Sequence, residues 1–301
     1  MGMRGFLIVL VIVVAGGFIF FPDQSNDAWQ DIKGLFSGNK APVNNVPEHN
    51  FTPDNSSFLA PSNYEVLTIA NWNIQTFGPS KASNPDLLRF YAEVLSQYDI
   101  VYVQEIRDAS GMAFQYLCAY MPRDYECEIS SRAGRTQMKE QYGLMYKNDI
   151  KLVNTKDFNP DFADRWERPP IMHEFQVGEY SFTVFNIHAK PDDVKQELIY
   201  LELEANNVEG NVMVIGDLNA DCGYYSQRFE PEFGAGWNWV ITNSMRTNMG
   251  RTPCAYDRAI LNDDMFFEFV DAGVRYEGIT NEHSDHYPIW VEINVTFDSK
   301  I

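Results

Sequence analysis

Residues able to do acid–base and metal chemistry fall at or near the ends of apolar stretches that are typical of β-strands. They are Asn73, Glu105, His188, Asp217 and Asn219, together with the adjacent pair Asp285 and His286. Strand ends hold side chains rigidly at a sheet edge, where carboxylate and carboxamide oxygens favour Mg²⁺, Mn²⁺ or Ca²⁺ over zinc. Two separate histidines with nearby acids could supply base and acid for a displacement at phosphorus. Each residue alone is more often a turn or cap residue, so the hypothesis depends on their combination.

The elements that must position these residues are short strands interrupted by two helices. Strands are predicted over Val66–Thr76, Ile100–Ile106, Tyr142–Tyr146, Ile171–Val177, Tyr180–His188, Val212–Leu218, Tyr256–Leu261 and Pro288–Val295. Apolar residues at three-to-four spacing predict helices over Asp86–Gln97 and Asp192–Asn206. Many strands with a few outer helices favour a layered α/β sandwich.

Composition sets limits on the partners. Hydrophobic residues make up 45% and aromatic residues 14% of the 301 positions, which excludes a disordered, collagen-like or coiled-coil chain. The 23 basic and 42 acidic residues give a net charge of −19, which argues against broad electrostatic binding to nucleic acid or anionic lipid. Any contact with phosphates must therefore be local.

The N-terminus is predicted to direct the chain out of the cytoplasm. Arg4 precedes an uncharged apolar run, Gly5–Phe21, which fits either a secretory signal peptide or an uncleaved membrane anchor over residues 1–21. A buried core helix is the less favoured alternative. Residues 22–63 are rich in Asn, Pro and Ser and predict a flexible tether, with one short helix over Ala28–Phe36. Residues 64–301 then form the folded domain, outside the cytoplasm by the positive-inside rule.

The four cysteines contain no Cys-x-x-Cys pair that would indicate zinc. They are Cys118, Cys127, Cys222 and Cys254. Disulfides are the expected state in an exported domain, with four buried thiols as the alternative.

Six segments together resemble the deoxyribonuclease I family, within the endonuclease/exonuclease/phosphatase superfamily. They are NWNIQTFG (71–78), VQEIRD (103–108), NIHAKPDD (186–193), GDLNADC (216–222), CAYDR (254–258) and SDHYP (284–288). The resemblance covers about residues 65–296 in the family's order. It implies an α/β (α+β) fold: a four-layer sandwich of two packed mixed β-sheets flanked by helices, with the active site at one edge.

The resemblance also implies roles for individual residues. Glu105 is the expected principal ligand of Mg²⁺ or Mn²⁺, helped by Asn73 and Asp285. Asp217 and Asn219 would orient the attacking water and the scissile phosphate. Two acid–base dyads are expected, and they are His188 with Glu140 and His286 with Asp257. By contrast, His173 and His283 match nothing catalytic and are expected to be packing residues.

Substrate contact is expected from a few cations at positions where the family contacts phosphate. These are Arg107, Arg135 and Arg168, with Lys190 as a further candidate that could equally be ordinary surface charge. Met138 stands where the family carries a tyrosine that packs into the DNA minor groove, so preference for duplex geometry is expected to weaken. Contacts limited to phosphate predict little base preference.

Two further features bear on the resemblance. Cys222 and Cys254 match the family's bridged pair, whereas Cys118 and Cys127 have no counterpart and could pair locally. Residues 246–254 lack the acidic and threonine series of the family's structural calcium site, which leaves Ca²⁺ a doubtful cofactor.

The leading hypothesis is a divalent-metal-dependent, largely sequence-non-specific endonuclease that hydrolyses DNA phosphodiesters outside the cytoplasm. DNA would be bound through its phosphate backbone, the membrane would be contacted only by an uncleaved N-terminal segment, and no protein partner is predicted. One alternative is a phosphodiesterase or phosphatase acting on a lipid or inositol phosphate. The other is a catalytically inactive binding domain with the same fold.

Overall fold

The computed structural model describes residues 11–14, 17–20, 65–227 and 232–296. The chain divides into two units, residues 1–56 and 57–301. In the first unit, β1 (Val11–Val14) and β2 (Gly17–Phe20) form an antiparallel pair. Among the described residues, no helix is long and apolar enough to cross a membrane. The predicted tether and its short helix lie outside the described residues, and the signal-or-anchor hypothesis remains a prediction.

Two six-stranded mixed sheets make up the second unit. In the first sheet the order is β13 (Phe269–Val274), β14 (Ile289–Asn294), β3 (Val66–Phe77), β4 (Ile100–Ile106), β6 (Gln141–Lys147) and β5 (Tyr125–Ile129). In the second it is β11 (Trp237–Trp239), β12 (Asp257–Asn262), β10 (Asn211–Asp217), β9 (Tyr180–Asn186), β8 (Ile171–Val177) and β7 (Lys151–Asp157). Only β3 with β4 and β9 with β10 pair in parallel; the other neighbours are antiparallel.

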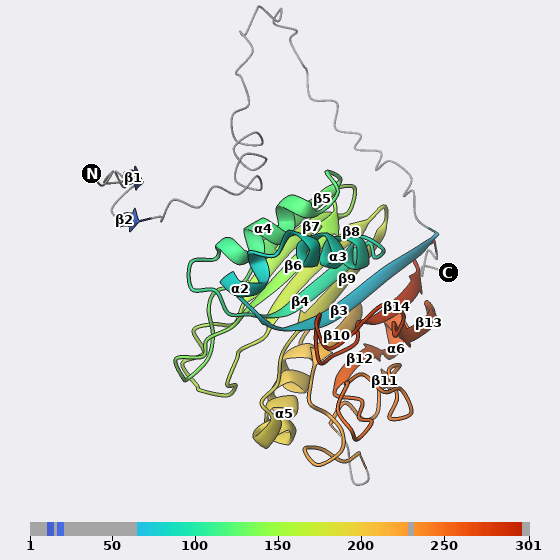
Figure 1. Ribbon diagram of the computed structural model, residues 1–301. Coiled ribbons are helices and arrows are strands. Elements are labelled where there is room, and N and C mark those ends of the chain that lie inside the picture. The colour runs from blue at the N-terminus through green and yellow to red at the C-terminus, as the bar shows by residue number, and fades with distance from the viewer. Residues whose placement is uncertain (1–10, 15–16, 21–64, 228–231, 297–301) are drawn as a thin grey trace, which may run out of the picture. The chain divides into compact units, whose positions relative to one another are not determined.

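Helices cover the outer faces of both sheets, as Figure 1 shows. In chain order the helical elements are α2 (Pro79–Ala82), α3 (Pro85–Leu95), α4 (Met112–Tyr120), the 3₁₀ turn η1 (Pro191–Asp193), α5 (Val194–Ala205) and α6 (Asp263–Phe266). Of these, α6 packs its Met265 into the core between the sheets. The Asn84 side chain caps α3 by accepting the backbone N–H groups of Asp86 and Leu87. The two predicted helices correspond to α3 and to η1 with α5, whereas α4 begins after Gly111 with no side-chain cap and was not predicted.

Three apolar clusters hold the layers together. One fills the space between the sheets, a second joins the first sheet to α3 and α4, and a third joins the second sheet to α5. In β4, Ile100 and Tyr102 face the opposite sheet while Val101 and Val103 face the helices, because successive side chains of a strand alternate in direction. The predicted four-layer sandwich is confirmed.

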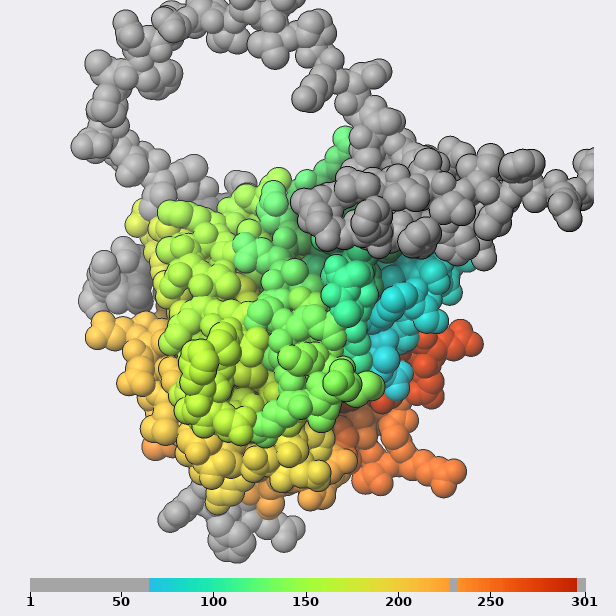
Figure 2. Space-filling view, turned by 90° about the vertical axis from the view of Figure 1, so that its left-hand side faces the viewer, coloured from blue at the N-terminus to red at the C-terminus, as the bar shows by residue number. Residues whose placement is uncertain are grey.

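One edge of the sandwich collects the ends of strands from both sheets. The carboxyl ends of the parallel pairs, β3 with β4 and β9 with β10, lie there, and the antiparallel neighbours β6, β12 and β14 begin there. In the space-filling view of Figure 2, the middle of the chain, drawn green to yellow, forms most of the visible face. Because these strand ends lie at one edge, the residues that precede or follow them in the sequence are brought together.

Candidate active site

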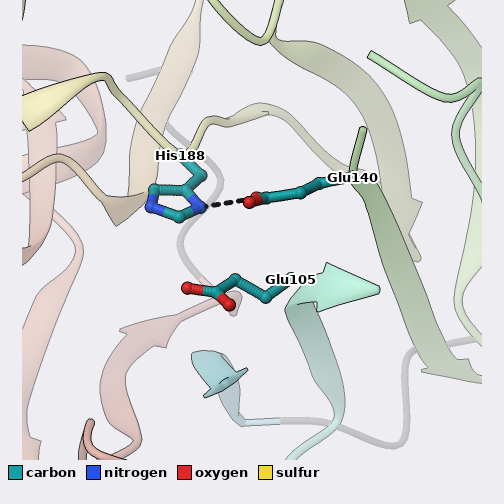
Figure 3. Close-up of side chains that lie close together, drawn as sticks. All are labelled: Glu105, Glu140 and His188. Atoms are coloured by element: carbon teal, nitrogen blue, oxygen red, sulfur yellow. Dashed lines mark hydrogen bonds and ion pairs between the residues drawn. The ribbon is translucent and has the colours of Figure 1, made fainter. Parts of the chain in front are cut away.

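The first dyad joins His188, which follows β9, to Glu140, which precedes β6. His188 Nδ1 lies 2.8 Å from Glu140 Oε2, and the two side chains meet beside Glu105 in Figure 3. Arg107 Nη2 donates to the other oxygen of Glu140 at 2.9 Å. Burial alone would raise the pKa of Glu140, but the positive charges of His188, Arg168 and Arg107 lower it to about 2. The Glu140 carboxylate is therefore ionised over the whole neutral range.

The second dyad joins His286, just before β14, to Asp257, the first residue of β12. His286 Nδ1 lies 2.8 Å from Asp257 Oδ2, and the Asp257 side chain is fully buried. Burial would lower the pKa of His286, but the carboxylates of Asp257, Asp217 and Asp285 outweigh it and raise the pKa to about 10. At neutral pH, His286 therefore carries a proton and a positive charge.

Asp217, the last residue of β10, connects the two dyads. Its Oδ2 lies 3.4 Å from His188 Nε2 and 3.6 Å from His286 Nε2. Burial opposes ionisation of Asp217, yet the two histidines and the Asn73 amide together lower its pKa. Asn219 adopts a left-handed conformation at φ 50° and donates its backbone N–H to Asp217 Oδ1. The predicted catalytic residues therefore form one continuous cluster.

The proposed metal ligands lie beside this cluster. Asn73 Nδ2 donates to Glu105 Oε1 and to Asp217 Oδ2, both at 3.1 Å, while Asn73 Oδ1 accepts the Gln75 N–H at 2.9 Å. Asp285 is half exposed, and its Oδ1 lies 4.0 Å from His286 Nε2. Glu105 and Asp285 thus offer hard oxygen donors that fit Mg²⁺ or Mn²⁺. Asn73 directs its nitrogen at the carboxylates, so in this arrangement it orients Glu105; it would serve as a ligand only with its amide turned over.

The same region contains two sets of side chains that could also hold a metal ion. Atoms of Glu105, Glu140 and His188 lie within 4.8 Å of one another, as do atoms of Asp217, Asp257 and His286. Arg107 bridges the first set, because its Nη2 is 2.8 Å from Glu105 Oε2 as well as 2.9 Å from Glu140. That guanidinium already balances charge between the Glu105 and Glu140 carboxylates.

The predicted phosphate-contacting residues differ in where their donors point. Arg107 and Arg168 belong to the cluster: Arg168 donates to the backbone oxygens of His188 and Ala189 at 2.9 and 3.1 Å. Arg135 instead contacts the loop before β8, with Nε 2.7 Å from Asp164 Oδ1 and Nη2 donating to Asp164 O at 2.8 Å. The other two predicted substrate-contacting residues are Met138, which is 60% exposed, and Lys190, which is partly buried. Lys190 has no ion pair within the part of the chain that the structure describes.

A buried amide cluster beneath the site was not predicted. Gln104 accepts the Asp217 N–H at 2.9 Å and donates to Ile187 O at 2.8 Å, so it contacts the neighbours of both dyads. Asn186 donates to Asn71 Oδ1 at 2.8 Å, and all three amide side chains are fully buried. The signal in the sequence is a polar residue at a strand position whose side chain, by the alternation along the strand, faces the opposite sheet. Such a fully satisfied network specifies one arrangement of the strands.

Gly216 shows how closely the strands approach beneath Asp217. A Cβ placed there would lie 2.1 Å from Ile187 O and 2.8 Å from Gln104 Nε2. Only glycine fits, because any side chain would push β10 away from the residue that precedes His188. This glycine keeps Asp217 within reach of His188.

Both disulfides form. Cys222 pairs with Cys254, as the resemblance implied, and Cys118 pairs with Cys127, leaving no unpaired cysteine in the described residues. The first bond joins the segment after Asn219 to the segment before Asp257.

The two histidines expected to be packing residues lie outside the cluster. His173 is buried and its Nδ1 hydrogen-bonds the Tyr102 hydroxyl at 3.0 Å, and burial lowers its pKa to about 4. His283 stacks on Phe90 with ring centroids 3.7 Å apart.

Comparison with known proteins shows the family of this chain. Residues 70–286 match the Endonuclease/Exonuclease/phosphatase family. The chain is 30% identical to Deoxyribonuclease-1 of Equus caballus over 261 residues, which cover 75% of this chain and 92% of that protein. It is 32% identical to Deoxyribonuclease-1 of Homo sapiens over 259 residues, covering 75% and 91%.

Solved structures show the same fold at lower identity. A humanized D. rerio TDP2 with 14 mutations has a TM-score of 0.59 at 15% identity, over 77% of this chain and 100% of that chain. A family protein from Bacteroides thetaiotaomicron has a TM-score of 0.56 at 16% identity, over 76% and 94%. The chain belongs to the endonuclease/exonuclease/phosphatase family and, within it, to the deoxyribonuclease I family.

Proposed function

We propose that this protein is a divalent-metal-dependent endonuclease that hydrolyses DNA phosphodiester bonds with little sequence preference. The observation that carries the proposal is the convergence of two histidine–carboxylate dyads on Asp217, 3.4 and 3.6 Å away, beside Glu105. This arrangement supplies proton donors, a proton acceptor and a cation site around one position. Family membership with relatives named Deoxyribonuclease-1 supports DNA as the substrate.

The charges favour different tasks for the residues of the cluster. Asp217 is ionised and has Asn219 beside it, so these two residues suit orientation of the attacking water and of the phosphate. His286 holds a proton at neutral pH and can give it to the leaving oxygen. His188 directs Nδ1 at Glu140 and Nε2 at Asp217, which places Nε2 at the centre of the cluster for proton transfer. Glu105 and Asp285 would hold a divalent ion, which would supply positive charge to stabilise the phosphate.

Substrate binding is expected to rely on phosphate contacts. Arg107 and Arg168 lie inside the cluster, paired with Glu140, and contacts with phosphate position a duplex without reading its bases. Met138 offers an exposed thioether rather than an aromatic ring. We therefore expect cleavage of many sequences, a weakened demand for duplex geometry, and loss of activity as salt rises.

We also propose that the domain acts outside the cytoplasm. Two disulfides in the described chain favour an oxidising compartment, and the apolar run Gly5–Phe21 supports export by a signal peptide or a membrane anchor. Whether the protein meets a membrane depends on cleavage of that run.

Plasmid nicking by the purified protein tests the proposal. We expect conversion of supercoiled to relaxed DNA with Mg²⁺ or Mn²⁺, no conversion with chelator, and no strong preference among the nicked sequences. A panel of sphingomyelin and inositol phosphates measured in parallel tests the lipid-phosphate alternative. Hydrolysis of that panel without nicking would replace the proposal, and inactivity on both would favour a binding domain.

A further inference from the structure

Lys81, in the short helix α2, connects two turns of the site that are far apart in the sequence. Its Nζ donates to Ile74 O and to His283 O, both at 2.8 Å. Ile74 directly follows Asn73, and His283 precedes Asp285 by two residues. Building on the proposed function, we propose that Lys81 is a positioning residue that sets the distance between the two halves of the metal site.

The first of these turns needs external support. Gln75 and Thr76 adopt left-handed conformations, at φ 46° and 52°, and non-glycine residues persist there only when surrounding contacts hold them. This conformation lets the Thr76 N–H donate to Glu105 Oε2 at 2.7 Å and the Gln75 N–H donate to Asn73 Oδ1. Holding Ile74 O therefore holds the backbone donors that orient Glu105 and Asn73.

The second turn is fixed on the side away from Lys81. His283 O also accepts the Tyr91 hydroxyl at 2.6 Å, and the His283 ring stacks on Phe90, so α3 anchors this carbonyl. Next to it, Ser284 Oγ donates to Asn73 O at 2.6 Å and accepts the His286 N–H at 3.0 Å. Lys81 and Ser284 thus form two parallel links between the turn after Asn73 and the turn before Asp285.

The ammonium suits this task better than other donors. It carries three N–H bonds in a tetrahedral arrangement, so one atom can bind two carbonyls that approach from different directions. It is half-buried, and Asp285 and Glu105, two proposed metal ligands, are the charges that act on it. Through these contacts Lys81 governs metal binding without contacting DNA.

Calorimetric titration of the intact protein with Mn²⁺, without DNA, tests the inference in wild type, Lys81→Met and Lys151→Met. The last is a matched control, because Lys151 is an exposed lysine at the start of β7 whose ammonium, among the described residues, hydrogen-bonds Gln176 Oε1 at 3.4 Å. We expect Lys81→Met to weaken Mn²⁺ binding about tenfold, the range seen when a residue that orients a metal ligand is removed. The Mg²⁺ concentration for half-maximal nicking should rise in parallel, with a smaller change in KM for DNA.

Three outcomes would overturn the role of Lys81. Unchanged Mn²⁺ affinity would mean that the links are dispensable. Tighter binding would mean that Lys81 acts only through its charge, which repels a cation. A lower melting temperature with unchanged affinity would mean a purely structural role. If Lys81→Met does not fold, Lys81→Ala is measured under the same criteria, while a wild type that neither binds Mn²⁺ nor nicks DNA would refute the proposed function instead.

Discussion

His188 and His286 each hold Nδ1 2.8 Å from a carboxylate oxygen, but the two dyads have different charged neighbours. The positive charges of His188, Arg168 and Arg107 lower the pKa of the Glu140 carboxyl to about 2. Around His286 lie three carboxylates, and the pKa of that imidazole rises to about 10. The two pairs share a geometry. In the first, the surroundings stabilise the ionised carboxylate, and in the second they stabilise the protonated imidazole.

This difference shows that a histidine–carboxylate pair is not a fixed unit of function. In the first dyad the cations keep the carboxylate ionised, so it orients His188 at any working pH. In the second, the carboxylates keep His286 protonated, so it is suited to donate a proton. Asp217 is the shared neighbour, with Oδ2 3.4 Å from His188 Nε2 and 3.6 Å from His286 Nε2.

Replacement of either histidine should cause the largest effect. We expect His286→Ala and His188→Ala each to lower kcat for plasmid nicking by about 10²–10⁴-fold, because each removes a positioned acid–base group. His173→Gln is the matched control, since His173 is buried outside the cluster. Near-normal nicking by His286→Ala, with an unchanged melting temperature, would exclude it from the chemistry.

The disulfide beside the second dyad should come next. Cys222 and Cys254 are 32 residues apart; Cys222 follows Asn219 and Cys254 precedes Asp257, each by three residues. We expect Cys222→Ser with Cys254→Ser to reduce the free energy of unfolding by about 3–4 kcal/mol on the chain-entropy model and to reduce nicking. Cys118→Ser with Cys127→Ser removes the other bond, which lies at α4 and β5 away from the dyads. Urea unfolding and nicking rates should separate the two cysteine pairs. Equal losses of nicking activity in the two double variants would contradict a special role for the Cys222–Cys254 bond.

The asymmetry predicts a specific pH effect for Asp257→Asn. Removing this carboxylate should lower the pKa of His286, so the alkaline limb of the pH–rate profile should move to lower pH. The pKa of His286 is raised from 6.5 to about 10 in the folded state, so the stability it contributes is complete below pH 6.5 and is lost as pH rises toward 10. The stability difference between wild type and variant should therefore shrink over that interval. An unmoved alkaline limb would show that another group controls it.

His173 provides the smallest effect and the contrast to both dyads. Its pKa is lowered from 6.5 to about 4 by burial alone, so the unfolded chain binds the proton more tightly below pH 6.5. Stability should fall between pH 6.5 and about 4, and His173→Gln should flatten that part of the curve in thermal unfolding. A slope identical to wild type would mean that His173 is not buried neutral.

Strands that are buried on both faces could be predicted from the sequence, and edge strands could not. All eight predicted strands are present, with ends that differ by at most two residues. In the two six-stranded sheets, the four strands that were not predicted, β5, β7, β11 and β13, lie at the outer edges. Their residues are mostly half-buried or exposed, so they lack the continuous apolar run that identifies a central strand.

The sequence by itself determined the layered fold, the residues at the strand ends and their family, because these depend on residue type and on short-range order. Only the tertiary structure decided the partners. It directed Arg135 to Asp164, placed Asn73 between Glu105 and Asp217, and joined the turns at Ile74 and His283 through Lys81. Such contacts join segments up to about 200 residues apart. Their distances, and the different charged neighbours of two similar dyads, follow from packing and not from local sequence.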